Sequence, residues 1–397
     1  MGGSRRSRGP NVVHLGLGHP IIDLVGRPSQ GESPAGRSLG GRLGADLDFD
    51  IPLTSNILGS ISRVDDLHKR WGHGSTVSDE KKFRLAELAQ LQSVAAAARL
   101  SGMRRSDDQI AEILAGRLGT AAERRLTRGY ARGWQHRFAS PNRPLGSTDL
   151  GRLNALVMDQ PGGTAVSDWR GEPLVREAFS AEGQATGRVY STLPPRSIES
   201  HMNSLIDQLN GELAHPARHP IPAIAMFVLG FLSASPFSAG NGRTACLAAG
   251  HLLRRAGYDH VGYSSLETQI EDLREPFQES FDASQTQFWS GGATTEPWLS
   301  LFVELLDRQR ERLDVQLALE QQSDALPPLQ AAILNVVREH GMVSAGVLIE
   351  STGANRNTLK DNLRRLVDGG ELERLGERRA AKYRLAPPKA PDPTSNL

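Results

Sequence analysis

A glycine-rich turn between two apolar segments is the part of this sequence best suited to chemistry. It reads Ser-Pro-Phe-Ser-Ala-Gly-Asn-Gly-Arg-Thr-Ala-Cys over residues 235–246. Gly240, Asn241 and Gly242 let the backbone take positive φ angles, so that successive N–H groups turn inward. A helix that begins near Arg243 would add unpaired N–H groups and the positive end of its dipole. The pattern predicts an anion-binding turn suited to a phosphate, with Arg243 as a charged fork.

Predicted helices flank this turn, in a chain whose pattern is mostly helical. Apolar residues recur at helical spacing in a series of segments. The predicted helices are 81–102, 106–118, 121–138, 147–158, 196–213, 222–234, 243–256 and 296–322. Ser106 is suited to cap one of them, and Gly119 to end it. Glycines and prolines over 161–195, with β-prone residues at 187–191, instead predict loops and a short hairpin.

Composition is that of an ordinary globular protein and excludes several classes. A length of 397 residues predicts two or three domains, and 23% charged with 38% hydrophobic residues suffices for a buried core. The net charge of +1 favours no class of partner. The single cysteine, Cys246, leaves no intramolecular disulfide and predicts a reducing, cytoplasmic compartment. The longest apolar run, 221–234, is shorter than the roughly 20 residues of a membrane span, so no membrane association is expected.

The turn resembles the motif of Fic (filamentation induced by cAMP) proteins. That motif reads His-x-Phe-x-(Asp or Glu)-Gly-Asn-Gly-Arg-x-x-Arg and lies between two helices. The matching residues here are Phe237, Gly240, Asn241, Gly242 and Arg243. The resemblance implies a mainly α fold, a Fic-type helical bundle with a small β-hairpin flap.

The resemblance extends beyond the motif, from about residue 80 to residue 320. The hairpin region 187–195, followed by a helix from Arg196, is similar to the flap that aligns a target segment in that family. Residues 263–298 resemble the family's C-terminal helices. We therefore expect a Fic-like domain over 51–322, including an N-terminal helical extension.

Three reactive positions depart from the family pattern. The resemblance implies transfer of AMP, or another phosphate-bearing group, from a nucleotide such as ATP to a hydroxyl of a protein target. The family's histidine base, Mg²⁺-binding acid and second arginine are replaced by Ser235, Ala239 and Cys246. A serine hydroxyl is not a general base near neutral pH, and such a base typically contributes about 10²–10⁴-fold. Alanine cannot ligate Mg²⁺.

The consequences expected at these positions are specific. We expect no metal site and no Mg²⁺ at Ala239, and a Ser235 that does not function as a base. Cys246 is interpreted as a small buried residue in the space of the arginine rather than as a nucleophile, because no nearby cation is evident to lower its pKa. Many family members also carry an inhibitory glutamate. The best-placed counterpart is the segment 97–102, where Ser101 stands at the glutamate position, so the site is predicted to be unrestrained.

Residues 326–386 predict a second module, a winged helix-turn-helix. Helical pattern covers 329–339, 345–351 and 356–368, with Gly353-Ala354-Asn355 as a turn and Gly369-Gly370 as a stop. Short strands are predicted at 371–374 and 381–385, joined by a basic wing at 377–379. The pattern resembles winged helix-turn-helix proteins, which also occur fused to Fic domains.

Local charge makes DNA a predicted partner of this module. The segment from Ser351 to Ala386 contains nine Lys and Arg residues and five Asp and Glu residues. Contact with phosphates requires such an excess of positive charge. We expect a group at the start of the third helix to meet base edges, namely Arg356, Asn357, Thr358 and Lys360. A second group is expected at phosphates, namely Arg364, Arg378 and Arg379. A protein-interaction or dimerisation module is the alternative, and a homodimer is compatible with either.

The favoured function is a degenerate Fic-fold protein that binds a nucleotide or phosphate group and DNA, a regulator without efficient AMP transfer. One alternative is an active protein adenylyltransferase, or another nucleotidyl transferase, with an altered site. His251 is a candidate replacement base in that case, although its place on the following helix favours packing or solvent. A scaffold that binds no nucleotide is the third hypothesis. Residues 1–50, rich in Gly, Arg, Ser and Pro, and residues 387–397 are predicted to be mobile tails.

Overall fold

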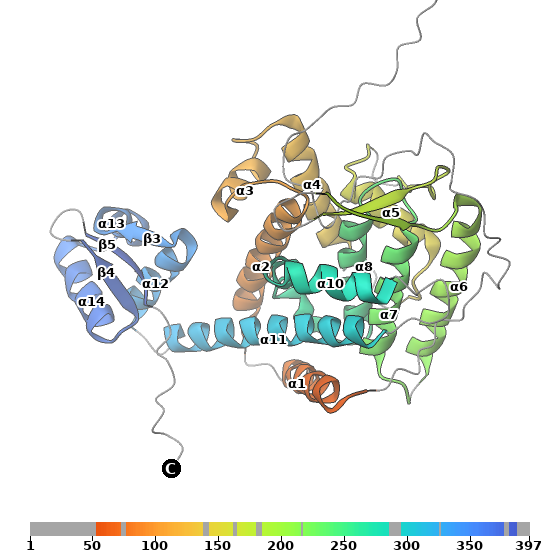
Figure 1. The fold of residues 1–397 in the computed structure, drawn as a ribbon. Coiled ribbons are helices and arrows are strands. Elements are labelled where there is room, and N and C mark those ends of the chain that lie inside the picture. Colours follow the sequence, from red (N-terminus) through yellow and green to blue (C-terminus); the bar gives the residue numbers. More distant parts are fainter. Residues whose placement is uncertain are drawn as a thin grey trace, which may run out of the picture. The chain divides into compact units, whose positions relative to one another are not determined.

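Helices make up most of the chain in its computed structural model (Figure 1). The structure describes residues 53–72, 77–137, 143–161, 165–179, 185–215, 217–285, 295–324, 327–376 and 381–386. The predicted tails, 1–50 and 387–397, lie outside these residues. The chain divides into two compact units, Met1–Arg312 and Leu313–Leu397. The division falls inside the helix Glu296–Asp324.

The first unit is a bundle of helices with one hairpin. Its helices are α1 (Ser55–Gly72), α2 (Asp79–Leu100), α3 (Asp107–Leu114), α4 (Ala121–His136), α5 (Ser147–Val157), α6 (Pro195–Ala214), α7 (Pro220–Ala234), α8 (Asn241–Arg255), α9 (Leu266–Asp272), α10 (Arg274–Gln285) and the start of α11 (Glu296–Asp324). A 3₁₀ turn covers Asp259–Gly262. The mainly helical expectation is confirmed.

Side-chain caps fix where several of these helices begin. Ser106 caps α3 and forms a capping box with Gln109, as its sequence position predicted. Thr120 and Glu123 form the same arrangement at α4. Each cap satisfies backbone N–H groups that the first turn of a helix leaves unpaired. Helix α1 was not predicted, although Ile57, Ile61 and Val64 have helical spacing and are buried.

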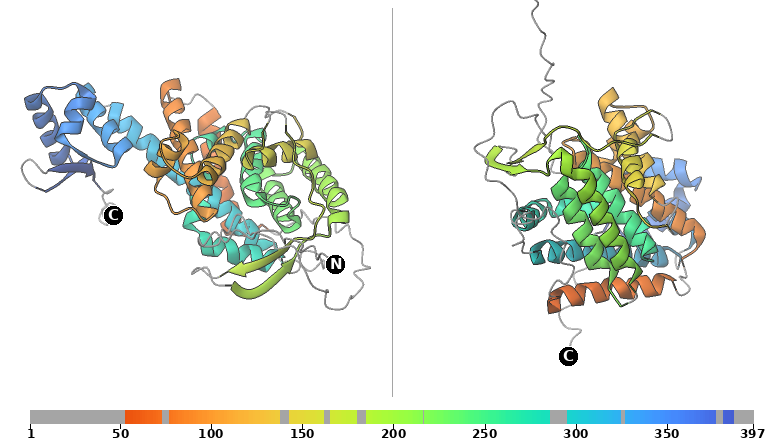
Figure 2. Two further views of the ribbon diagram at one scale, coloured as in Figure 1. Left: turned by 90° about the horizontal axis from the view of Figure 1, so that it is seen from above. Right: turned by 90° about the vertical axis from the view of Figure 1, so that its right-hand side faces the viewer.

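Helix α7 is the centre of the first unit, because all but its first residue is buried. It packs between α6 and α8, and the views in Figure 2 show these three helices side by side. The Trp298 indole of α11 donates a hydrogen bond to the Ala225 carbonyl of α7 at 2.7 Å. A helix that is apolar on every side is stable only inside a larger bundle. Its buried position explains the long apolar run of the sequence.

The hairpin consists of strands β1 (Val175–Phe179) and β2 (Ala185–Ser191). They are antiparallel, with Val175 opposite Ser191 and Phe179 opposite Ala185. The predicted β-prone segment 187–191 is part of β2, so the hairpin prediction is confirmed.

The second unit has the order α12 (Pro328–His340), β3 (Met342–Ser344), α13 (Ala345–Thr352), α14 (Arg356–Asp368), β4 (Leu372–Leu375) and β5 (Lys382–Leu385). The strands form an antiparallel sheet in the order β3-β5-β4. Apolar side chains from all three helices share one core, which includes Ile333, Leu348 and Leu363. Strand β3 was not predicted, because three residues are too few for a pattern of alternation.

Among the described helices, none is both long enough and apolar enough to cross a membrane.

Candidate functional site

The motif turn connects the end of α7 to the start of α8. Helix α7 ends at Ala234, and α8 begins at Asn241. Gly240 precedes α8 with φ 75°, in the left-handed region. A Cβ atom at Gly240 would lie 3.0 Å from Met158 Sδ and 3.1 Å from Val157 Cγ1. Glycine is therefore needed here both for its backbone angle and for the close approach of α5.

Two asparagine side chains fix the shape of this turn. The Asn241 side chain accepts a hydrogen bond from Phe237 N at 2.9 Å and donates one to Phe237 O at 2.8 Å. From α5, Asn154 Nδ2 donates to Ala239 O at 2.9 Å and to Thr244 Oγ1 at 3.1 Å. Thr244 Oγ1 in turn donates to Gly240 O at 2.8 Å. The turn is held from within and from α5, so its backbone conformation is fixed by side-chain hydrogen bonds.

The turn is exposed at its middle and buried at the start of α8. Ser238 and Ala239 are exposed, while Gly240 and Gly242 are buried. The first N–H groups of α8 have no acceptor within the helix, and its dipole places positive charge at the same end. The predicted residues Gly240, Asn241 and Gly242 thus lie together at a helix N-terminus, which is the geometry of a phosphate site.

Arg243 is packed inside the protein rather than extended into solvent. It is 5% exposed. Its Nη1 atom donates to Val157 O at 3.5 Å, and Nη2 lies 3.8 Å from Met158 Sδ. The guanidinium therefore lies under the turn, against the end of α5. It contributes positive charge close to the turn and also helps to hold α5 in place.

Ser235 has the backbone of a special position but a side chain that is already engaged. Its φ of 44° and ψ of 64° are left-handed, which is uncommon for a residue other than glycine. It is 2% exposed, and its hydroxyl donates a hydrogen bond to Leu232 O at 2.8 Å. A buried hydroxyl whose proton is bound to a carbonyl is not disposed to remove a proton from a substrate.

Arg170 is a buried guanidinium beside Ser235 that the sequence did not single out. Its Nε donates to Ser235 O at 2.8 Å, Nη1 to Glu172 O at 2.8 Å, and Nη2 to Leu193 O at 2.5 Å. Its own backbone N–H donates to Pro236 O at 2.9 Å. Burial lowers the pKa of Arg170 to about 10, which leaves it charged at neutral pH. Arg170 thus ties both ends of the hairpin segment to the motif turn.

The Mg²⁺-binding position of the family does not fit a metal in this chain. Ala239 has no ligand atom in its side chain, and its carbonyl already accepts the hydrogen bond from Asn154. Hard cations such as Mg²⁺ need oxygen ligands. The described residues contain no group of three or more His, Cys, Asp or Glu side chains that could hold a metal ion.

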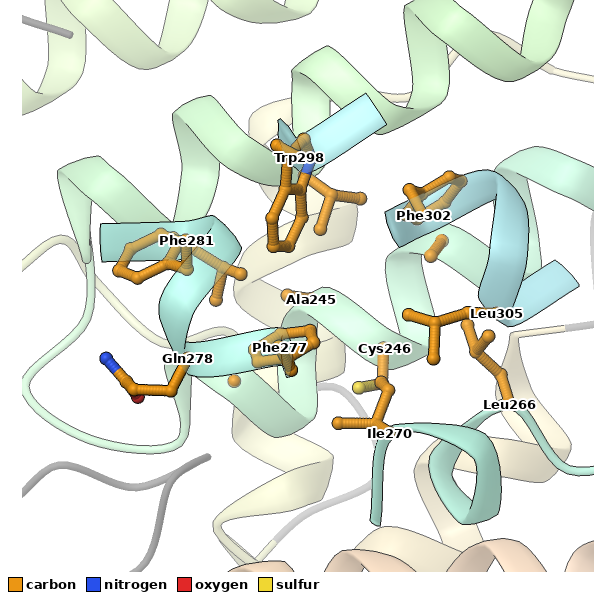
Figure 3. Close-up of a pocket in the computed structure, with 14 residues that line it drawn as sticks. Ala245, Cys246, Leu266, Ile270, Phe277, Gln278, Phe281, Trp298, Phe302 and Leu305 are labelled. Atoms are coloured by element: carbon orange, nitrogen blue, oxygen red, sulfur yellow. The ribbon is translucent and has the colours of Figure 1, made fainter. Parts of the chain in front are cut away.

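Cys246 faces an apolar cavity that is lined by residues of α7, α8, α9, α10 and α11. The cavity measures about 30 Å³, and Figure 3 shows Cys246 beside Ile270 of α9 and Phe277 of α10, with Trp298 and Phe302 of α11 across from it. The thiol is 7% exposed, and burial raises its pKa well above the usual range, with Glu267 adding to the rise and Arg137 opposing it. A buried, protonated thiol is a poor nucleophile. The surroundings of Cys246 are therefore mainly apolar.

Behind Cys246 lies a buried charge pair that sequence patterns did not reveal. Arg137, at the end of α4, and Glu267, in α9, are both buried, with Arg137 Nη1 3.7 Å from Glu267 Oε1. Tyr130 donates to the same carboxylate at 2.5 Å. Arg137 passes α8 at Gly250, where a Cβ atom would lie 2.6 Å from Arg137 Nη1. These residues are about 130 positions apart in the sequence, and only the fold brings them together.

Two further positions named from the sequence lie away from the turn. Ser101 ends α2, and its hydroxyl donates to Ala97 O at 2.8 Å within the same helix. His251 lies near the other end of α8, where its Nδ1 is 2.8 Å from Arg137 O. His251 is therefore not placed to act on a ligand at residues 240–243.

The residues expected to contact DNA lie on one exposed surface as far as they are described. Helix α14 begins after Asn355, whose side chain accepts hydrogen bonds from the Thr358 N–H and hydroxyl, each at 2.9 Å. The exposed residues of this helix include Arg356, Asn357, Thr358, Lys360 and Arg364. The spacing of 356, 360 and 364 puts three cations along one side of the helix. Arg378 and Arg379 lie outside the described residues.

The architecture of the first unit, with its glycine turn between two central helices, is that of Fic proteins. The chain is similar to the structure of a Fic family protein from Desulfovibrio desulfuricans G20, with a TM-score of 0.53 and 19% identity over 84% of this chain and 97% of that one. It is also similar to a Fic domain-containing signaling protein from Bacteroides thetaiotaomicron VPI-5482, with a TM-score of 0.52 and 20% identity over 65% of this chain and 94% of that one.

Residues 144–253 match the model of the Fic/DOC family. The matched region runs from just before α5 to near the end of α8, so it contains the hairpin, Arg170 and the whole motif turn. This part of the chain is a Fic/DOC family domain. No curated protein sequence matches the chain.

The contacts of Arg170 predict that lysine cannot replace it. A lysine keeps the charge but places all its donors on one nitrogen, which cannot reach acceptors in three segments. We expect Arg170→Lys to lower the free energy of unfolding by about 2–4 kcal/mol, the range for breaking a buried charged network. Urea denaturation would measure it. Arg117→Lys is the matched control, because its ion pair with Glu112 is exposed to solvent and contributes little to stability. Equal stability of the two variants would show that Arg170 is not needed.

Proposed function

We propose that this protein is a degenerate Fic-fold regulator, which binds a phosphate group at the start of α8 and DNA through its second unit. The nucleotide phosphate of ATP or of a related compound is the proposed ligand of the turn, and efficient AMP transfer is not part of the function. One observation carries the proposal. The turn that would bind phosphate has its glycines and the hydrogen bonds of Asn241 to Phe237, while Ser235, Ala239 and Cys246 occupy the positions of the family's reacting groups.

The proposal that the turn binds an anion rests on its geometry. Asn241, Asn154 and Thr244 fix the backbone by side-chain hydrogen bonds, without using the N–H groups at the start of α8. A preorganised helix N-terminus recognises phosphate through those N–H groups and through its dipole. The buried charge of Arg243 lies directly beneath and strengthens the attraction in a poorly solvated environment.

The proposed loss of efficient transfer rests on the three replaced positions together. Fic-family domains are known for AMP transfer, which needs a base, charge neutralisation and a phosphate clamp at one transition state. In this chain Ser235 donates its proton to a carbonyl, Ala239 offers no carboxylate, and Cys246 faces apolar side chains. Groups that act as a unit are not additive, so the absence of three of them removes more than any one would.

The proposal of a DNA-binding winged helix rests on the second unit. Its order of helix, strand, two helices and two strands supports the proposal, because winged helix-turn-helix modules have the same order and place their third helix in the major groove. Here that helix is α14, and its exposed side carries Arg356, Lys360 and Arg364, while Leu359 and Leu363 face the core. A module that used this surface for a protein partner or a homodimer would not require such a cationic stripe.

Removal of Arg243 is expected to weaken anion binding at the turn. We expect Arg243→Ala to raise the Kd for ATP, ADP or AMP by about tenfold or more, since a hydrogen-bonded charge close to a phosphate contributes about 1.5–3 kcal/mol. Isothermal titration calorimetry on the full chain would measure it, with thermal unfolding as a check that the variant is folded. Arg84→Ala, which removes an exposed arginine of α2, is the charge-matched control. Equal affinities of wild type and Arg243→Ala would refute phosphate binding at this turn.

DNA binding is expected to depend on salt through α14. The affinity for DNA falls as salt rises, and each lost phosphate contact makes the slope of log K against log salt less steep by about 0.9. The double variant Arg356→Ala, Arg364→Ala should reduce the steepness of this slope by between about one and two. Arg364 is assigned to a phosphate and accounts for about one, and Arg356 adds to it only if it also contacts a phosphate. Fluorescence anisotropy with a mixed-sequence duplex would follow this. The control is the double variant Arg84→Ala, Arg117→Ala, which makes the same change of charge in the first unit.

A chain that ends at Gln322 should lose DNA binding. If this truncated chain binds DNA as well as the full chain does, the second unit is not the DNA-binding part of the protein.

Neither the native chain nor Ser235→His should transfer AMP to itself or to proteins of a lysate. A histidine at this position supplies a base but leaves the phosphates without Mg²⁺ at Ala239 and without an arginine at Cys246. The combined variant Ser235→His, Ala239→Asp, Cys246→Arg restores all three groups and is the informative comparison. Because Ser101 provides no inhibitory glutamate, its activity should be unrestrained. Incubation with labelled ATP would decide, and strong labelling by the native chain that Arg243→Ala abolishes would favour an active adenylyltransferase.

A further inference from the structure

A polar pocket near the C-terminal end of α8 has no part in the function proposed above. It measures about 50 Å³ and shares none of its lining with the apolar cavity beside Cys246. Its volume is enough for a few water molecules, since one needs roughly 10–15 Å³ by the same measure. Its ionisable lining residues come from the end of α4, the segment before α5, α5 itself and α8: His136, Arg137, Arg143, Asp149, Arg152 and His251.

The lining is strongly cationic, and its one acid is already engaged. Asp149 forms an ion pair with Arg143 and also accepts the Gly146 N–H at 2.9 Å. Arg137 is paired with Glu267, on the buried side. The charge of Arg152 remains uncompensated by any ion pair among the described residues, and its buried Nε has no hydrogen-bond acceptor there. A buried N–H without an acceptor is destabilising, and a bound anion would relieve that cost.

Two histidines complete the wall and face several charges. His251 Nδ1 lies 2.8 Å from Arg137 O, so Nδ1 carries the proton and Nε2 is left for a ligand. Burial lowers the pKa of His251, while the hydrogen bond to Arg137 O and the charge of Asp149 oppose the fall, and Arg255 and Arg143 add to it. Burial likewise lowers the pKa of His136, helped by Arg152, His251 and Arg143 and opposed by Asp149.

We propose that this pocket is a second anion site, which binds the phosphate group of inorganic phosphate or of a small phosphate ester on Arg152 and Arg143, with His251 and His136 as proton-dependent donors. An anion between the four side chains accepts hydrogen bonds from the arginines and stabilises the protonated imidazoles. Binding therefore takes up protons and tightens as pH falls, because an added negative charge raises the pKa of a neighbouring histidine.

The site is distinct from the motif turn. His251 lies ten residues after Asn241, which is about 15 Å along the same helix. The two sites are recognised differently, since the turn offers backbone N–H groups and the pocket offers side chains. A protein with both would respond to two phosphate groups at opposite ends of α8.

Sulfate is the probe that separates the proton uptake of the protein from that of the ligand, because its charge does not change between pH 6 and pH 8. We expect the full chain to bind sulfate several-fold more tightly at pH 6 than at pH 8. One pKa unit of coupling corresponds to at most about a factor of ten, and burial lowers the pKa of both histidines, so only part of that factor is reached at pH 6. Calorimetry in two buffers of different ionisation enthalpy would measure the protons taken up. NMR would follow the ring signals of His251 and His136 as pH changes. The signal that is missing from the His251→Gln variant belongs to His251.

Variants assign the binding to this pocket. Arg152→Gln should weaken sulfate binding at least about tenfold, and His251→Gln should reduce its pH dependence, whereas the exposed control Arg117→Gln should change neither. Arg243→Ala should leave the pH-dependent binding of sulfate intact, which distinguishes the pocket from the turn.

If Arg152→Gln does not fold, Arg143→Gln replaces it, because the Arg143 side chain is largely exposed. Inorganic phosphate and AMP, each titrated against sulfate, identify the source of the anion. Sulfate affinity that is independent of pH, or unchanged in folded Arg152→Gln, would overturn the proposal.

Discussion

The geometry of the motif turn depends on the guanidinium of Arg170. This group is buried, yet every acceptor around it is a carbonyl or a hydroxyl rather than a carboxylate. Taking a charge out of water is costly, so the arrangement is stable only because several backbone dipoles point at the same cation. Those carbonyls belong to segments before the hairpin, after the hairpin and in the turn. One side chain thereby fixes the relative position of three chain segments that are otherwise linked by loops.

The shape of the turn and the side chains at residues 235, 239 and 246 are independent of one another. The turn is held by backbone angles and by the side chains of Asn241 and Asn154, and none of these hydrogen bonds uses the side chain of residue 235, 239 or 246. Cys246 and Gly242, one turn earlier on α8, border the same apolar cavity. Behind Cys246, the charges of Arg137 and Glu267 compensate each other inside the protein. Gly250 allows that pair by leaving room for Arg137 beside α8.

The sequence predicted much of the fold because its helices carry strong local information. Apolar periodicity, the cap at Ser106 and the glycine turn are each encoded within a few residues, and the structure contains them. Helix α1 was missed because it follows a long stretch without periodicity, and β3 because it has three residues. Arg170, Arg137 and Glu267 could not be found, since their importance arises from contacts over tens to more than a hundred positions. A pattern gives residue type and spacing, but not which distant side chain a buried charge will meet. The burial of Arg243 against the end of α5 also depends on such a distant contact.

The left-handed backbone at Ser235 joins a local signal to a contact made far away in the sequence. A residue with a Cβ atom is roughly 1–2 kcal/mol less stable in that conformation than in a right-handed helix. The next residue is Pro236, which disfavours a right-handed helical backbone at residue 235, so the sequence itself ends α7 near this point. The Ser235 carbonyl then accepts a hydrogen bond from Arg170 Nε at 2.8 Å. The proline stops the helix, and the distant guanidinium holds the first peptide after it.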